Sequence, residues 1–178
     1  MTESTSFFAH GSRWMRADFH LHTRRDKEFK DTGSEKDFVE RYISALKQAD
    51  IRIGVITNHN KFDREEFKAL RKAAKQEDIY LMPGVELSVK DGRNGIHTLV
   101  VFHEDWIDNR ENADHINSFL GLSFAGQTGY NNSNARSNHD LLETLRELDK
   151  FEKNYLLIFA HVEDDSGLWG ALDGGRIT

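Results

Sequence analysis

The strongest chemical signal in the sequence is a pair of histidines in the segment Asp18-Phe19-His20-Leu21-His22-Thr23. Side chains two residues apart on a β-strand point to the same face, about 6.6–7 Å apart along the chain. His20 and His22 would therefore present two imidazoles together, with Asp18 on the same face as a further ligand or as a partner of the ligands. Neutral ring nitrogens at this spacing can hold a divalent metal, although an H-x-H pair by itself is weak evidence for a site.

Other apolar segments lead into residues that can also bind a metal, namely His59, Glu86 and His161. In a parallel α/β fold the carboxyl ends of the strands meet on one rim, where ligands and catalytic groups lie. Leaving a buried imidazole unpaired costs about 1–3 kcal/mol, so several together are best explained by a shared metal. His97 begins a strand instead of ending one. It shares a face with Glu86 if the hairpin places Lys90 opposite it, and a one-residue slip would separate the two.

Hydrophobic periodicity predicts that these residues lie on alternating strands and helices. The predicted strands are Trp14–Leu21, Ile51–Thr57, Ile79–Met82, Val85–Val89, Ile96–Phe102 and Tyr155–Ala160, and the predicted helices are Glu35–Ala49, Asp63–Gln76, Glu111–Leu120 and Leu141–Leu148. This alternation predicts an α/β fold with a parallel layer or barrel.

The chain has 178 residues, enough for one domain with its own core or for a piece of a larger one. We expect residues 1–178 to form a single domain, with residues 104–154 as an irregular insertion. The sequence stops in turn-like residues soon after a strand, where an α/β fold normally continues with a helix. We therefore expect the N-terminal part of a longer protein or a truncated chain.

Composition excludes several functions. The absence of cysteine excludes disulfides, thiolate zinc sites, iron–sulfur clusters and a cysteine nucleophile. No apolar run approaches the roughly 20 residues that cross a bilayer, and the N-terminus lacks the order of a signal peptide, so we expect a cytoplasmic protein without a membrane partner. The formal net charge of −6 provides no general attraction to nucleic acid.

In combination, the metal-binding segments resemble the PHP (polymerase and histidinol phosphatase) family of metal-dependent phosphoesterases. The matching motifs are DFHLHT (18–23), ITNHN (56–60), GVELS (84–88), HTLVVF (97–102) and IFAHV (158–162). They extend over most of the chain, and their combination is specific where each motif alone is not. The segments 11–14 and 58–63 are similar to a branch in which a PHP domain precedes an ABC/SMC-like ATPase domain in the same protein.

The resemblance implies a distorted (β/α)7 barrel, incomplete at its C-terminus in this chain, with two or three divalent metal ions (Zn, Mn or Fe) on its rim. It implies the following ligands: His20 and His22 from the first motif, Glu86 as the carboxylate between two metals, His97 and His161 on the second metal, and His59 on a third. We assign Glu86, His22 and His161 as the catalytic residues.

The sequence departs from the family pattern at three places. Asn58 stands where the second motif usually has an acid, so the charge at that position is lost. Asp26 and Glu28 are the candidates for a ligand that many members place shortly after the first motif. The closing Asp-x-His motif does not follow His161, which predicts an incomplete metal site in this chain.

The residues and the resemblance agree on hydrolysis of a phosphate ester by metal-activated water. Arg24 and Arg25 follow the first motif and are candidates for binding a substrate phosphate, the alternative being a solvated charged loop.

The leading hypothesis is a nuclease-like enzyme that acts on nucleic acid and is coupled to an ATPase. A small-molecule phosphatase, which the net acidity favours, and a catalytically degenerate scaffold or regulatory module are the alternatives. Hydrolysis of carbon–nitrogen bonds is less favoured, because no strand end provides the bridging lysine that such sites require.

Overall fold

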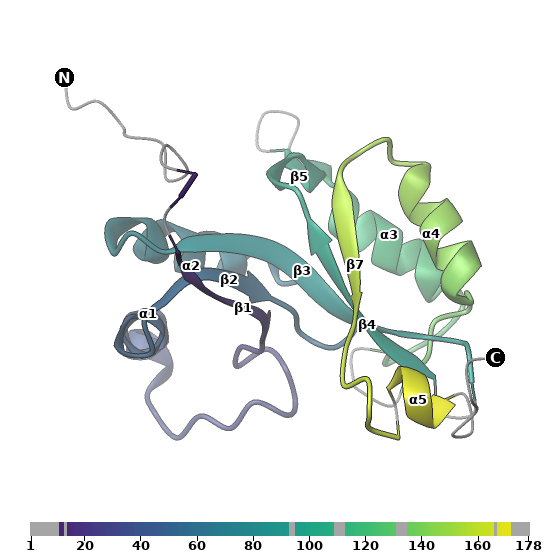
Figure 1. The fold of residues 1–178 in the computed structure, drawn as a ribbon, viewed down its shortest axis with the longest axis horizontal. Coiled ribbons are helices and arrows are strands. Elements are labelled where there is room, and N and C mark those ends of the chain that lie inside the picture. The colour runs from purple at the N-terminus through teal and green to yellow at the C-terminus, as the bar shows by residue number, and fades with distance from the viewer. Residues whose placement is uncertain are drawn as a thin grey trace.

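The computed structural model describes residues 11–12, 14–92, 95–108, 113–130, 135–165 and 167–171. Within these residues the main sheet has five strands in the order β1–β2–β3–β4–β7. They are β1 (Arg16–Leu21), β2 (Ile51–Ile56), β3 (Tyr80–Val89), β4 (Ile96–Phe102) and β7 (Tyr155–Phe159). The sheet is curled like half of a barrel (Figure 1).

The sheet is mixed: it contains the parallel layer and also the hairpin that the sequence predicted. Strands β1, β2 and β3 are parallel, whereas β4 is antiparallel to both β3 and β7. The described strands thus form a partial barrel in a mixed α/β fold, and the sevenfold β/α repeat is not confirmed. The reversal has a simple cause: β3 ends at Val89 and β4 begins at Ile96, so the connection is too short for the crossover that a parallel strand needs.

Two helices cover the parallel strands: α1 (Phe38–Gln48) and α2 (Arg64–Gln76) (Figure 1). The predicted helix Glu35–Ala49 is divided in the structure, because a short 3-10 turn, η1 (Glu35–Asp37), precedes α1. Ser34 caps that turn, since its side chain accepts a hydrogen bond from the backbone N–H of Lys36.

Strand β3 changes its partner halfway along its length. It pairs with β2 as far as Pro83, and from Gly84 onward it pairs with β4. A Cβ atom at Gly84 would lie 2.7 Å from Cγ1 of Val55, so only glycine fits where the strand passes from one neighbour to the other. The sequence predicted two strands interrupted at Pro83–Gly84. The structure instead has one continuous strand, which places Glu86 inside the strand and not at its end.

The register of the β3–β4 hairpin places Ser88 opposite His97 and Glu86 opposite Leu99. The register considered from the sequence, with Lys90 opposite His97, differs from this one by two residues. A shift of two residues leaves every side chain on its original face, so Glu86 and His97 still share one face of the sheet.

The segment between β4 and β7 contains further short elements: η2 (Glu104–Trp106), β5 (Ile107–Asp108), β6 (Ala113–Asp114), α3 (His115–Ser123) and α4 (Leu141–Asp149). Helix α3 begins later than predicted, because the Asp114 side chain caps it by accepting from the backbone N–H of Asn117. A last helix, α5 (Leu168–Ala171), follows β7. Residues 93–94, between the predicted strands Val85–Val89 and Ile96–Phe102, lie outside the described residues. So do residues 111–112 of the predicted helix Glu111–Leu120 and residues 131–134 of the predicted insertion.

Part of this segment returns to β3. Beyond the end of β2, the backbone N–H of Ser137 donates to the carbonyl of Ser88, and the N–H of Lys90 donates to the carbonyl of His139. The last part of this edge, at Ser88 and Lys90, is therefore covered by backbone from the segment before α4.

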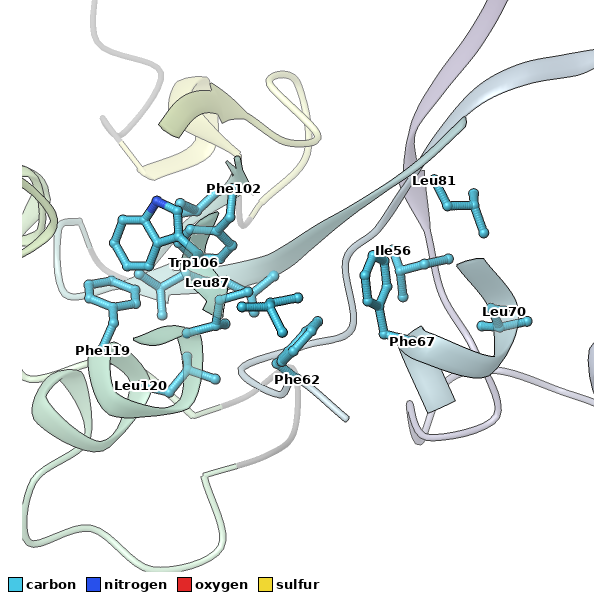
Figure 2. Packing of buried hydrophobic residues seen from close by; sticks show 14 of the residues in the cluster. Ile56, Phe62, Phe67, Leu70, Leu81, Leu87, Phe102, Trp106, Phe119 and Leu120 are labelled. Carbon is cyan, nitrogen blue, oxygen red and sulfur yellow. The ribbon is translucent and has the colours of Figure 1, made fainter. Parts of the chain in front are cut away.

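The hydrophobic core extends along both halves of β3 (Figure 2). Near the parallel strands it contains Ile56, Phe67, Leu70 and Leu81, and near β4 and α3 it contains Leu87, Phe102, Trp106, Phe119 and Leu120. Among the described residues, no helix has the length and apolarity that crossing a membrane requires.

Candidate metal centre

A buried carboxylate, that of Glu86, lies at the centre of a histidine cluster. The side chain of Glu86 is fully buried, and its Oε2 atom faces histidines from the ends of β1 and β2. Oε2 lies 2.7 Å from Nε2 of His20, 3.1 Å from Nε2 of His59 and 3.4 Å from Nε2 of His22. One carboxylate oxygen is thus surrounded by imidazole nitrogens.

The other oxygen of Glu86 faces a different pair of histidines. Oε1 lies 2.7 Å from Nδ1 of His97 and 3.3 Å from Nε2 of His161. His97 reaches this position because β4 runs against its neighbours, so that its amino end lies beside the carboxyl ends of β3 and β7. A histidine that begins its strand is therefore brought to the rim where the others end.

A β-bulge at the end of β1 helps to position His20. Asp18 pairs with Gly54 and Leu21 with Ile56, so β1 carries one residue more than β2 over this interval. The backbone N–H of His20 donates to the Asp18 carboxylate at 3.0 Å. Asp18 thereby supports the bulge, and it belongs to neither of the groups that could hold a metal among the described residues.

The loop after β2 is held directly against the strand that carries Glu86. His59 forms a parallel bridge to Glu86, and the backbone N–H of Asn60 donates to the Glu86 carbonyl at 2.8 Å. Asn60 and His161 both have left-handed backbone conformations, with φ angles of 50° and 46°. Such conformations are costly for residues other than glycine and concentrate at functional sites.

Asp26 lies behind two of the imidazoles. Its Oδ2 atom accepts from Nδ1 of His22 at 3.0 Å, and from both Nδ1 and the backbone N–H of His59 at 2.9 and 2.7 Å. A carboxylate can only accept in these contacts, so Nδ1 of each ring carries a proton. Nε2 of each ring, which faces Glu86, can bind a metal ion once it loses its own proton. Carboxylates commonly orient metal-binding histidines in this way. The sequence indicated Asp26 as a candidate ligand, and the structure places it in contact with the ligands' other ring nitrogens.

The cluster shifts the pKa values of its own groups. Burial would raise the pKa of Glu86, but hydrogen bonds with His20, His22 and His97 outweigh it and hold the pKa well below the usual range. Burial would lower the pKa of His22, whereas hydrogen bonds with Asp26 and Glu86 raise it to about 9. Without a cation, protons on the imidazoles therefore balance the buried carboxylates.

These residues form groups that could hold a metal ion. Among the described residues, two groups have ligand atoms within 4.8 Å of one another: His20 with Glu86 and His161, and His22 with His59 and Glu86. Nε2 of His20 lies 3.1 Å from Nε2 of His22, so the two groups are next to each other. Imidazole nitrogens with a shared carboxylate suit zinc, manganese or iron. By geometry His59 groups with His22 and Glu86, whereas the resemblance implied a third metal for it.

The two arginines after the first motif contact carboxylates of the protein. Nε of Arg24 donates to Glu66 at 2.7 Å, and its guanidinium lies over the ring of Phe38. Arg25 pairs with Asp63 at 3.1 Å, while 41% of its side chain stays exposed. Arg24 is therefore held inside the loop, and Arg25 is the more accessible of the two.

Asn58, which replaces the expected acid, links two strand ends. Its Oδ1 accepts from the backbone N–H of Thr23 at 2.8 Å, and its amide donates to the Thr23 hydroxyl at 3.0 Å. The Tyr42 hydroxyl, which the sequence analysis did not connect with the site, donates to the His22 carbonyl at 3.0 Å. The one feature of the sequence that could have indicated this role of Tyr42 is a hydroxyl group on an otherwise apolar helix face.

A curled α/β sheet with a buried carboxylate shared between sets of histidines is an arrangement typical of metal-dependent hydrolases. The fold is similar to that of a protein from Bifidobacterium adolescentis described as a metal-dependent phosphoesterase, with a TM-score of 0.53 and 10% sequence identity, over 86% of this chain and 69% of that one. At this identity the similarity establishes the fold alone.

An amidohydrolase from Chromobacterium violaceum, solved with bound sulfate and no metal, gives a TM-score of 0.42 at 19% identity, over 61% of this chain and 33% of that one. That similarity is too low to indicate a common fold. No protein-family model matches the sequence, and no curated protein matches it.

Proposed function

We propose that this chain is a metal-dependent phosphoesterase of the PHP type, which hydrolyses phosphate esters by attack of water. The observation that supports it most is the Glu86 carboxylate, because each of its oxygens faces a separate set of imidazoles. Two divalent ions held here would activate a water molecule and neutralise the charge of the phosphate oxygens.

The solvent exposure of the histidines suggests a different role for each of them. His59 and His97 are buried, and we propose that they hold the ions in place. Glu86 joins the two positions, and His22, oriented by Asp26, supplies a ring nitrogen to one of them. The side chain of His161 is 38% exposed, more than that of any other histidine in the cluster. We propose that it faces the substrate.

Arg25 is the arginine that we propose to contact a substrate phosphate, since part of its guanidinium-bearing side chain reaches solvent. Arg24 shares Glu66 with it and is more enclosed, so its contribution would come through the position of the loop. Both roles depend on the phosphoesterase proposal.

The contacts of Asn58 argue against a degenerate scaffold. The Asn58 amide is hydrogen-bonded to Thr23, next to the end of β2. An acid at this position would therefore contact Thr23, and its replacement by asparagine takes no carboxylate away from the histidines. Asp26 supplies a second buried carboxylate to the histidines instead. Carbon–nitrogen bond hydrolysis is disfavoured, because Lys90, which directly follows β3, is exposed and is not part of either metal-binding group among the described residues.

Metal content and hydrolysis together test the proposal. The protein is stripped with a chelator and reloaded with Mn²⁺, its metal is counted, and release of p-nitrophenol from p-nitrophenyl phosphate is measured. We expect about two ions per chain. Glu86→Gln should lose at least about 100-fold in activity, more than is usual for residues that only orient ligands. Glu65→Gln removes an exposed carboxylate of the same size and serves as the matched control. Background metal in the reloaded protein, or full activity in Glu86→Gln, would refute the proposal.

A nuclease and a small-molecule phosphatase are separated by a second pair of substrates. Degradation of 3′-labelled single-stranded DNA with Mn²⁺ would support the nuclease-like activity, whereas release of phosphate from small esters alone would support the phosphatase. Coupling to an ABC/SMC-like ATPase rests on the sequence resemblance and stays a prediction.

A further inference from the structure

A cavity of about 390 Å³ lies directly beside the histidine cluster. Its wall includes His20 and His22 at the end of β1, residues of the loop that follows, and one side of α1. Because the same two histidines belong to the cluster and to the cavity wall, a molecule in the cavity would lie next to any phosphate held at the metal centre.

Part of the cavity wall is aromatic. The rings of Phe29, Phe38 and Tyr42 have centroids 5.4–6.2 Å apart and are inclined to one another by 41–88°. Phe38 is buried and packs against the other two rings, whereas Phe29 and Tyr42 are only partly buried. The exposed parts of Phe29 and Tyr42 can contact a further aromatic ring, and such ring pairs are favourable. The volume also lies within the range of small-molecule sites, which are mostly apolar with a few polar groups.

The charged groups of the cavity neutralise each other. Arg41 donates to both carboxylate oxygens of Asp31, at 2.7 and 2.9 Å, and its Nε donates to Asp37. Hydrogen bonds from Arg41 lower the pKa of Asp31 to about 2, so the pair stays ionised together. An arginine compensated by two carboxylates does not attract a free phosphate, and the cavity therefore suits the uncharged part of a substrate.

We propose that this cavity binds the organic group of the phosphate ester, an aromatic ring joined to the phosphate directly or through one carbon. The proposal rests on the phosphoesterase function proposed above, because it takes the phosphate to be held at the histidine cluster. Under it, the protein selects aryl and benzyl phosphates over small alkyl phosphates by the contacts of their rings with Phe29, Phe38 and Tyr42.

Inert phosphonates test the inference without turnover. Binding of phenylphosphonate and methylphosphonate to the Mn²⁺-loaded protein is measured by calorimetry, since the two differ only in the group expected to enter the cavity. Burial of a phenyl ring predicts about 10- to 100-fold tighter binding of phenylphosphonate. Ala45→Phe fills the cavity from an exposed position of α1 and should remove this preference, leaving methylphosphonate binding unchanged.

Ala69→Phe, on an exposed position of α2, is the matched control and should keep the preference. Equal affinity for the two phosphonates, or a preference that survives Ala45→Phe, overturns the role of the cavity and leaves the phosphoesterase proposal intact. Failure of the metal-loaded protein to bind either phosphonate overturns both proposals.

Discussion

Replacing Asp26 by asparagine tests how the histidines are oriented. Oδ2 of Asp26 accepts from the rings of both His22 and His59, while Oδ1 accepts from the backbone N–H of Glu28. Asparagine keeps one oxygen, which carries no charge, and replaces the other with an amide group that cannot accept. Hydrogen bonds to a charged acceptor contribute about 1.5–3 kcal/mol and neutral ones about 0.5–1.5 kcal/mol. The two imidazole contacts should therefore weaken by about 2 kcal/mol together.

At about 1.4 kcal/mol per factor of ten, this loss corresponds to metal binding weakened about 30-fold. The affinity of Asp26→Asn for Mn²⁺ or Zn²⁺ is measured by competition with a chelator of known affinity. Glu28→Gln, an exposed carboxylate of the same loop, controls for the general loss of negative charge. If Asp26→Asn and Glu28→Gln bind metal equally well, Asp26 does not orient the ligands.

Two further predictions concern pH and packing. The pKa of His22 is raised from 6.5 to about 9 in the metal-free protein. Its contribution to the stability of the fold is therefore complete below pH 6.5 and is lost as the pH rises through about 9. Metal binding should become stronger over the same pH interval, because the metal displaces that proton. Chemical denaturation and metal titration between pH 6 and pH 10 check the two trends, and a flat response in both would contradict the shift. Gly84→Ala should lower the free energy of unfolding by about 1–3 kcal/mol, because its Cβ would lie within contact distance of Val55, Thr57 and Val100. An unchanged urea midpoint would show that β3 can move aside.

The strands and helices that carry a clear hydrophobic period could be predicted from the sequence. The apolar run beginning at Ile51 forms β2 within one residue of the prediction, and α2 starts after Asp63, whose side chain caps it. The prediction of two separate strands, Ile79–Met82 and Val85–Val89, was wrong, because the structure has one strand, β3. Hydrophobic periodicity does not reveal that a strand can continue while its neighbour in the sheet changes. That exchange depends on contacts between segments far apart in the chain.

The histidine cluster itself could be anticipated, because residues at strand ends are brought together by the sheet. The structure brings His20, His22, His59, His97 and His161 around Glu86. The supporting contacts could not be predicted in the same way. Asp26 lies in a loop, where side-chain direction has no period, and the direction of the Tyr42 hydroxyl depends on how α1 is placed against β1.

The segment that contains Ser137 and His139, between β4 and β7, protects the end of β3. If the contacts of Ser137 and His139 were removed, the polar backbone at Ser88 and Lys90, at the end of the strand bearing Glu86, would form an open edge. Open edges invite pairing with strands of other molecules and hence aggregation. Shortening this connection should therefore lower the solubility of the protein and disturb the metal centre, even though the sequence predicts the region to be only an irregular insertion.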